Sequence, residues 1–232
     1  MDISARLKGT LAQAVVKAAF SHFQYRVVPF GIEETVREVA SLEKEEYDKL
    51  DLPPTLRQTP DFIVASLDMS RAHLVEVKFR KRWSDKIRKL LFNTLRNQIM
   101  SWGGKLIVVF VFRDFFGKGT CLKCLSLKVE DDGKRYLEVV SPSGVVKNYN
   151  DVTEADFCDL SAFFPMVETE SPEFKSALVS LVSAQEVLSN NGQEDDPPVR
   201  EEVVPPVVTP PPQPRPRPPF FARPPARTKL PA

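Results

Sequence analysis

The 232-residue chain has few of the residues that mark several common protein classes, with only three cysteines and two histidines. Three cysteines without regular spacing argue against a disulfide framework and predict a reducing environment. Neither histidine has a serine or cysteine partner arranged around it, which disfavours a nucleophilic triad. Cys121 and Cys124 resemble half of a zinc site, but no second pair follows, and residues three apart in a strand point to opposite faces. We therefore interpret the cysteines as packing residues.

Long hydrophobic runs are also lacking. The longest dense apolar run, 106–112, has the length of a strand and is too short to span a membrane. The opening MDISARLKG predicts an amphipathic helix and differs from a signal peptide. No internal repeat is visible. We therefore expect a cytoplasmic protein, in the sense of intracellular and reducing, without a membrane partner.

Proline is the residue in excess, and it is concentrated at one end. Fourteen of the 21 prolines fall in residues 197–232. Proline lacks a backbone donor and has a fixed φ, so residues 191–232 are predicted to be a disordered Pro/Arg-rich tail. Its basic residues and the motif PPPQPRP allow loose DNA contact, binding of a protein partner through an aromatic groove, or a simple spacer. A core domain over 1–168 and a C-terminal helix over 169–190 precede the tail.

The hydrophobic pattern of residues 1–168 predicts an α/β fold. A helix over 4–24 with two apolar stripes precedes a short strand in YRVVPFG, and the acidic residues 32–50 favour a second helix. DFIVASL and AHLVEVKF predict two strands, followed by an amphipathic helix from Trp83 to Trp102. KLIVVFVF is apolar throughout, which is typical of a central strand covered on both faces. CLKCLSLKV and RYLEVVS predict a further hairpin. This order indicates a mixed central β-sheet flanked by helices.

Charge is strongly segregated despite a net charge of +1. Residues 32–51 hold eight acids and three bases, whereas seven of the twelve residues 78–89 are Lys or Arg. The basic strip suits phosphate contacts with DNA that are independent of base sequence, although a solvated helix start has the same composition. The predicted nucleic-acid-binding residues are Arg80, Lys81, Arg82, Lys86, Arg88 and Lys89.

Three charges in the two neighbouring strands point to chemistry. Glu76 and Lys78 are two residues apart and share one face of a strand, and Asp61 opens the preceding strand. Charges in apolar strands are costly unless they are paired. Asp61, Glu76 and the carbonyl of Val77 offer hard oxygen ligands for Mg²⁺, with Mn²⁺ as a substitute. A bound ion would activate water, and Lys78 would orient or deprotonate that water and offset transition-state charge. An ordinary hairpin with charges on a solvated edge is the alternative.

This arrangement depends on hairpin register. With a five-residue loop over 68–72, Asp61 would pair with Phe79 and lie on the face opposite to Lys78. We therefore predict a loop of four or six residues, or a bulge near Pro60, which returns Asp61 to the face of Glu76.

The order GTLAQAVVKAAFSHFQYRVV, PDFIV, VEVKF, RNQIMSW and an apolar strand resembles the PD-(D/E)xK nuclease superfamily over residues 6–112. Within it, the chain is most similar to archaeal Holliday-junction resolvases and related repair nucleases. The resemblance implies a restriction-endonuclease-like fold and an Mg²⁺-dependent deoxyribonuclease that hydrolyses phosphodiester bonds, with branched DNA of repair or recombination as a candidate substrate. Asp61 and Glu76 would be metal ligands and Lys78 the catalytic lysine. Many relatives carry a glutamate where this chain has Gln13, which removes one potential ligand.

The sequence leaves the roles of two glutamines open. Gln98 lies within the apolar stripe of its helix, where it either reaches the catalytic pocket, as a glutamine does in relatives, or bonds locally to backbone. Gln13 lies at the edge of its helix's apolar sector and is either a neighbour of the site or exposed to solvent. An inactive member of the same fold that binds DNA or protein, and a structural adaptor, are the alternatives to an enzyme. A junction resolvase would require a homodimer, for or against which the sequence has no evidence.

Overall fold

The computed structural model describes residues 3–32, 39, 42, 44–112, 121–130, 136–168, 171, 172, 174–176 and 178. The chain separates into two units, Met1–Pro197 and Pro198–Ala232, and described residues occur in the first. The predicted disordered tail over 191–232 lies outside the described residues. So does most of the helix predicted over 169–190. The described residues from Pro172 to Leu178 are helical.

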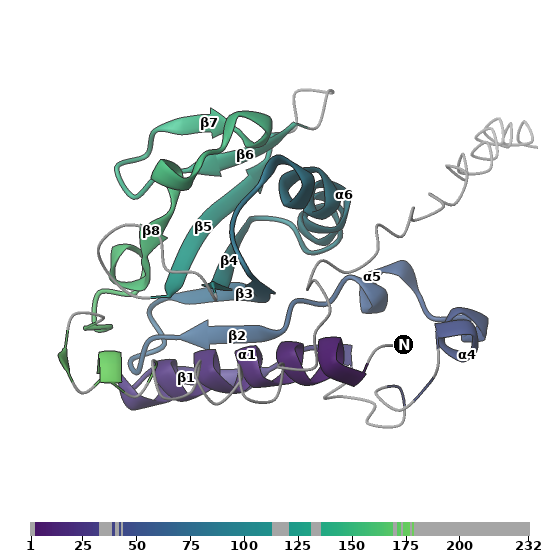
Figure 1. Ribbon diagram of the computed structural model, residues 1–232, viewed down its shortest axis with the longest axis horizontal. Helices are drawn as coiled ribbons and strands as arrows, with labels where there is room; N and C mark the ends of the chain where they lie inside the picture. Colours follow the sequence, from purple (N-terminus) through teal and green to yellow (C-terminus); the bar gives the residue numbers. More distant parts are fainter. Residues whose placement is uncertain are drawn as a thin grey trace, which may run out of the picture. The chain divides into compact units, whose positions relative to one another are not determined.

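A mixed sheet of eight strands forms the centre of the described part of the chain (Figure 1). The strand order is β1-β2-β3-β4-β5-β6-β7, and β8 pairs with β5. β3 and β4 are parallel, and the other described pairs are antiparallel. The mixed α/β architecture and the β5–β6 hairpin confirm the sequence prediction. The strands are β1 (Arg26–Pro29), β2 (Phe62–Ala65), β3 (Ala72–Arg80), β4 (Lys105–Phe112), β5 (Leu122–Val129), β6 (Leu137–Val140), β7 (Val146–Asn148) and β8 (Cys158–Asp159).

The described helices are α1 (Ile3–His22), α4 (Lys44–Lys49), α5 (Pro54–Arg57) and α6 (Asp85–Trp102). Three short 3₁₀ turns are η1 (Tyr149–Asp151), η2 (Glu154–Asp156) and η3 (Leu160–Ala162). The helix predicted over 32–50 lies partly outside the described residues, and α4 is its longest described stretch. α5, β7, β8 and the 3₁₀ turns carry no strong periodicity, and the sequence did not predict them.

β4 is covered on both faces, as its uninterrupted apolar run predicts. Ile107, Val109 and Val111 belong to a core cluster with α1, whereas the alternate residues join a second cluster with α6. α1 and α6 therefore pack on opposite faces of the sheet (Figure 1). Burying each such side chain contributes about 1.5–3 kcal/mol to folding.

α1 packs through one face, and the prediction of two packed stripes was wrong. Ala12, Val15 and Val16 are buried, whereas Ala14 and Ala18 face solvent. Alanine has little apolar area, so its position in a periodic pattern discriminates poorly between core and surface. The buried face of α1 ends in an aromatic group in which Phe20 contacts Tyr25 and Phe164.

α6 has well-defined ends. Ser84 is its N-cap, and the Ser84 hydroxyl oxygen accepts a hydrogen bond from Ile87 N at 3.3 Å. Such a cap stabilises a helix by about 1 kcal/mol. At the other end Gly103 has φ 71°, a conformation that glycine adopts readily, and its N–H donates to Ile99 O. α6 thus covers the helix predicted from Trp83 to Trp102 except for its first two residues, and it presents Gln98 to the sheet.

Candidate active site

The β2–β3 hairpin brings the two predicted acids to the same level. The strand pairing runs from Ala65 with Ala72 at the loop to Phe62 with Val75 at the open end, which leaves a six-residue loop over 66–71. One step beyond this ladder, the register places Asp61 level with Glu76. The prediction of an even-numbered loop is confirmed.

Asp61 is held directly before the start of β2. Its Oδ2 accepts a hydrogen bond from the backbone N–H of Val77 at 2.6 Å, and its Oδ1 accepts one from Gln13 Nε2 at 2.7 Å. The ladder between β2 and β3 ends at Val75, so the Asp61 carboxylate satisfies a backbone donor that would otherwise lack a strand partner. Gln13 is half-buried and contacts Asp61. Of the two positions left open by the sequence, it therefore occupies the one beside the candidate site and not the solvent-exposed one.

Glu76 lies beneath α6 and is only 4% exposed. Lys78 Nζ donates to Glu76 Oε1 in a close ion pair, and Gln98 Nε2 donates to Glu76 Oε2 at 2.8 Å. A buried carboxylate is tolerated because each oxygen has a donor, one of them charged. Gln98 therefore reaches the candidate site and is not confined to a local backbone contact.

Lys78 carries the proton in this arrangement. Burial by itself would lower the pKa of its ammonium, and Arg80 acts in the same direction. The carboxylates of Glu76 and Asp61 outweigh both, so the pKa of Lys78 is raised above its ordinary value of 10.5. At neutral pH the side chain is thus a fixed positive charge, suited to stabilising anionic oxygen and unsuited to accepting a proton.

The donor set fits one hard divalent cation. Each carboxylate oxygen of Asp61 and Glu76 accepts a hydrogen bond, and a carboxylate oxygen has two lone pairs, so such a bond does not exclude a cation from the same oxygen. N–H and C=O of one strand residue point to the same edge, so the Val77 carbonyl lies on the side that faces Asp61. The buried Gln98 Oε1 has no hydrogen-bond partner among the described residues. Within that part of the chain, no group of three or more His, Cys, Asp or Glu side chains converges, so carboxylates alone do not complete a metal site.

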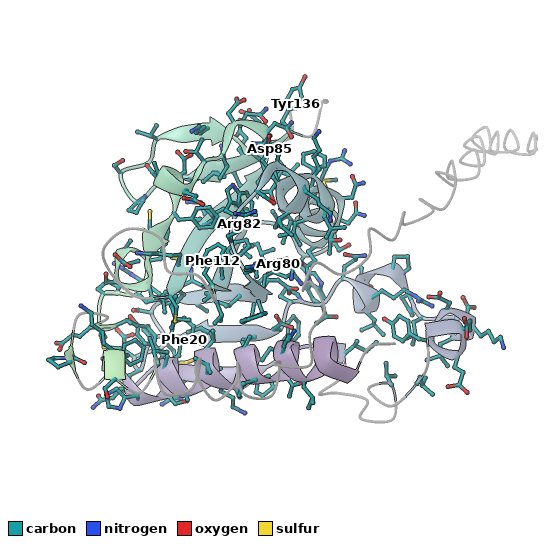
Figure 2. All side chains as sticks on the ribbon, viewed as in Figure 1. Phe20, Arg80, Arg82, Asp85, Phe112 and Tyr136 are labelled. Atoms are coloured by element: carbon teal, nitrogen blue, oxygen red, sulfur yellow. The ribbon has the colours of Figure 1, made fainter. Side chains whose placement is uncertain are left out.

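The basic strip divides into exposed and packed residues. Lys81, Arg82, Lys86 and Lys89 are exposed, and Figure 2 shows Arg80, Arg82 and Asp85 following one another from β3 to the start of α6. Arg80 is half-buried and donates to Phe79 O at 2.6 Å. Arg88 is mostly buried, with an ion pair to Asp85 at 3.1 Å and a hydrogen bond to Val152 O at 3.3 Å. Four of the six predicted phosphate-contacting residues are thus available at the surface.

The cysteines are free thiols in or against the α1 core cluster. Cys121 and Cys124 are buried, and burial raises the pKa of Cys121 to about 11. The expectation that these two point to opposite faces was wrong, because Cys121 precedes β5 and both contact the same cluster. Cys158 of β8, distant in sequence, lies opposite Cys124 of β5 in the pairing of these two strands.

No protein family, curated protein or solved structure matches the chain. Among the described helices, none combines the length and the apolar character that crossing a membrane requires.

Proposed function

We propose that this protein is a metal-dependent deoxyribonuclease. The observation that carries the proposal is that Glu76 and Lys78 form an ion pair level with Asp61, directly before β2, with both carboxylates held in place by donors. Two acids and an ammonium beside a basic surface are the groups required for hydrolysis of a phosphodiester. In an ordinary solvated hairpin, Glu76 would be exposed to solvent and would not accept a second hydrogen bond from a helix, as it does from Gln98 of α6.

The role of each side chain follows from its contacts. A divalent ion, Mg²⁺ or Mn²⁺, held by Asp61, Glu76 and the Val77 carbonyl would supply Lewis acidity and an activated water. Gln13 and Gln98 fix the directions of the two carboxylates. Lys78, protonated at neutral pH, orients the reacting groups and stabilises the extra negative charge on phosphoryl oxygen. Of the two roles open to Lys78 from the sequence, this favours charge stabilisation over proton abstraction.

We further propose that the sheet belongs to the restriction-endonuclease-like class. Support comes from a mixed sheet with α1 and α6 on opposite faces and a hairpin that carries the acids and the lysine. The DNA would lie along the exposed side chains of Lys81, Arg82, Lys86 and Lys89, which predicts contacts with phosphate and little preference for base sequence. Branched repair or recombination DNA is the substrate that the sequence resemblance favours, and paired cuts in a junction would require a homodimer.

One observation favours a second candidate, an inactive member of the same fold that binds DNA or a partner protein. Gln13 donates to Asp61 at the position where a glutamate would add a third carboxylate. An amide offers a cation one neutral oxygen in place of a charge, so ion affinity would be lower than in a site with three acids. A structural adaptor, the third candidate, would neither cut nor bind DNA.

A cleavage assay distinguishes these functions. Linear, branched and single-stranded DNA would be incubated with the protein and Mg²⁺ or Mn²⁺, and wild type compared with Lys78→Met. The exposed α1 residue Lys17 provides the control Lys17→Met. Cleavage that is abolished in Lys78→Met and retained in Lys17→Met supports the nuclease. DNA binding without cleavage in wild type supports the inactive form, and absence of both supports the adaptor.

A further inference from the structure

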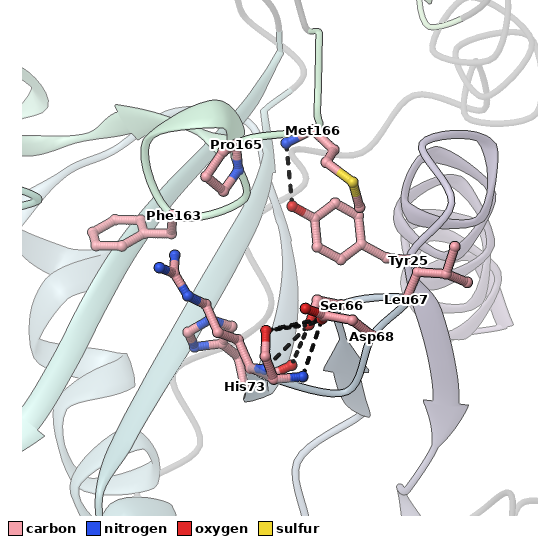
Figure 3. Close-up of a pocket in the computed structure, with 10 residues that line it drawn as sticks. Tyr25, Ser66, Leu67, Asp68, His73, Phe163, Pro165 and Met166 are labelled. Carbon is pink, nitrogen blue, oxygen red and sulfur yellow. Dashed lines mark hydrogen bonds between the residues drawn. The ribbon is translucent and has the colours of Figure 1, made fainter.

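A second candidate site lies at the far end of the β2–β3 hairpin from Lys78. An open cavity of about 660 Å³ lies between the hairpin loop over 66–71 and the turn over 163–166 (Figure 3). Arg71 and Lys78 are seven residues apart, which corresponds to roughly 23 Å along the strand direction. His73 also lies on the α1 face, where its ring contacts Phe164, whereas Glu76 and Lys78 lie on the α6 face. The cavity is therefore separate from the candidate active site.

Hydrogen bonds define both walls of this cavity. In the hairpin loop, the Asp68 carboxylate accepts from Ser66 Oγ at 2.6 Å, from Ser70 N at 3.1 Å and from Ser70 Oγ at 2.8 Å. In the opposite wall, Met166 N donates to Tyr25 Oη at 3.2 Å, as Figure 3 shows. A ligand would enter a largely preformed space, which reduces the ordering cost of binding.

The lining is apolar apart from a few polar groups. Leu67 is 54% exposed and Met166 is 42% exposed, and they lie beside Phe163, Pro165 and Tyr25. Small-molecule sites are commonly apolar and aromatic cavities of roughly 300–1,000 Å³ with a few placed polar groups. Both the size and the lining of this cavity agree with that class.

Charge indicates what the ligand should carry. Among the described residues, the Arg71 guanidinium has no hydrogen bond or ion pair with another side chain. The opposing charge, Asp68, stays ionised, because the hydrogen bonds from Ser66 and Ser70 lower its pKa to about 2, and these donors hold its Oδ1 within the hairpin loop. A guanidinium at the edge of an apolar space is complementary to a carboxylate attached to an apolar body.

We propose that this cavity binds a small apolar ligand with one anionic group, of the chemical class of an aliphatic or aromatic carboxylate. The apolar part lies against Leu67, Phe163 and Met166, and the carboxylate pairs with Arg71. This proposal is independent of the nuclease proposal, because the two sites share no residue and lie at opposite ends of the β2–β3 hairpin.

Titration calorimetry on the full chain tests the assignment. The probes are octanoate and 2-naphthoate, each compared with its neutral counterpart, 1-octanol or 2-naphthol. We expect one saturable site, with each anion bound about tenfold more tightly than its neutral counterpart, the factor given by one charged hydrogen bond. The relative affinities of the two acids distinguish an aliphatic from an aromatic ligand.

Matched variants locate the binding. Arg71→Gln should weaken both anions about tenfold and leave the neutral probes unchanged, whereas Arg82→Gln, the same change on the basic strip, should leave the affinities of all four probes unchanged. Met166→Asp should abolish binding of all four probes. Val145→Asp, at another apolar side chain that is 66% exposed, should not. Absence of saturable binding up to millimolar concentration, equal affinity in Arg71→Gln, or equal weakening in the two aspartate variants would overturn the proposal.

Discussion

Gln13 Nε2 lies 2.7 Å from Asp61 Oδ1, across 48 residues of chain. On the other face of the sheet, Gln98 makes the equivalent contact with Glu76 at 2.8 Å. Two glutamines from helices on opposite faces thus each hold one carboxylate of the candidate site. All four carboxylate oxygens of the two acids therefore accept a hydrogen bond.

Replacing Gln98 by leucine should destabilise the protein by about 2 kcal/mol, because a buried carboxylate loses a donor. The same change at Asn97, its exposed neighbour on α6, should alter the free energy of unfolding by less than about 0.5 kcal/mol. Urea unfolding of both variants measures the difference. Equal stabilities would mean that the Gln98–Glu76 contact is energetically unimportant.

Gln13→Glu should make the unfolding temperature depend more strongly on divalent metal. The new carboxylate would repel Asp61 in EDTA, and a bound cation would relieve that repulsion. We expect a lower Tm than wild type in EDTA and a larger rise with millimolar Mg²⁺, equivalent to about 1–2 kcal/mol by linkage. Thr10→Glu, exposed on the same helix, is the control. A metal response equal to that of wild type would argue against an ion at Asp61.

Arg82→Gln, Lys86→Gln and Lys89→Gln should each reduce the salt dependence of DNA binding. Removing one phosphate-binding cation lowers the magnitude of the slope of log K against log salt by about 0.9. Arg88→Gln should instead lower stability, because Arg88 bonds to Val152 O and Asp85. Fluorescence anisotropy over a salt series measures the slopes, with Lys17→Gln as reference. Unchanged slopes in all three variants would place the DNA elsewhere.

The Lys78–Glu76 pair should stabilise the fold until strongly alkaline pH. The pKa of Lys78 is raised above 10.5, so its contribution is complete below that value and disappears as pH rises through the higher folded-state pKa. Lys78→Met should cost about 3 kcal/mol at pH 8, and the double variant Glu76→Gln/Lys78→Met should cost less. Unfolding measured from pH 8 to 11.5 tests this. If the destabilisation caused by Lys78→Met already declines below pH 10, the raised pKa of Lys78 is contradicted.

His73 should make the fold less stable in mild acid. Burial, with added repulsion from Arg71 and Lys105, lowers the pKa of His73 below 6.5. The unfolded chain therefore takes up the proton first, and the stabilising contribution present above pH 6.5 is lost as pH falls through the folded-state pKa. His73→Gln should flatten the dependence of Tm on pH between 7 and 5.5, with His22→Gln as control. An unchanged dependence would assign the acid sensitivity to other groups.

Local patterns in the sequence were sufficient for much of the fold. The apolar run of β4, the capped helix α6 and the alternating residues of β3 were predictable, because each depends on periodicity within one element. The apolar stripes of α1 were less informative, since alanine fits either surface. β7 and β8 are too short for any period to appear, and their pairing depends on contacts with β6 and β5.

For the candidate site, the sequence alone determined which side chains have the right chemistry and that Glu76 and Lys78 share a face, since a strand alternates with a period of two. Only the tertiary structure decided that Asp61 stands level with Glu76, because that depends on the six-residue loop and on the end of the β2 ladder. It also decided that Gln13 and Gln98 reach the two acids. Hydrogen bonds between residues so far apart in the chain depend on how the helices pack on the sheet, which no local pattern encodes.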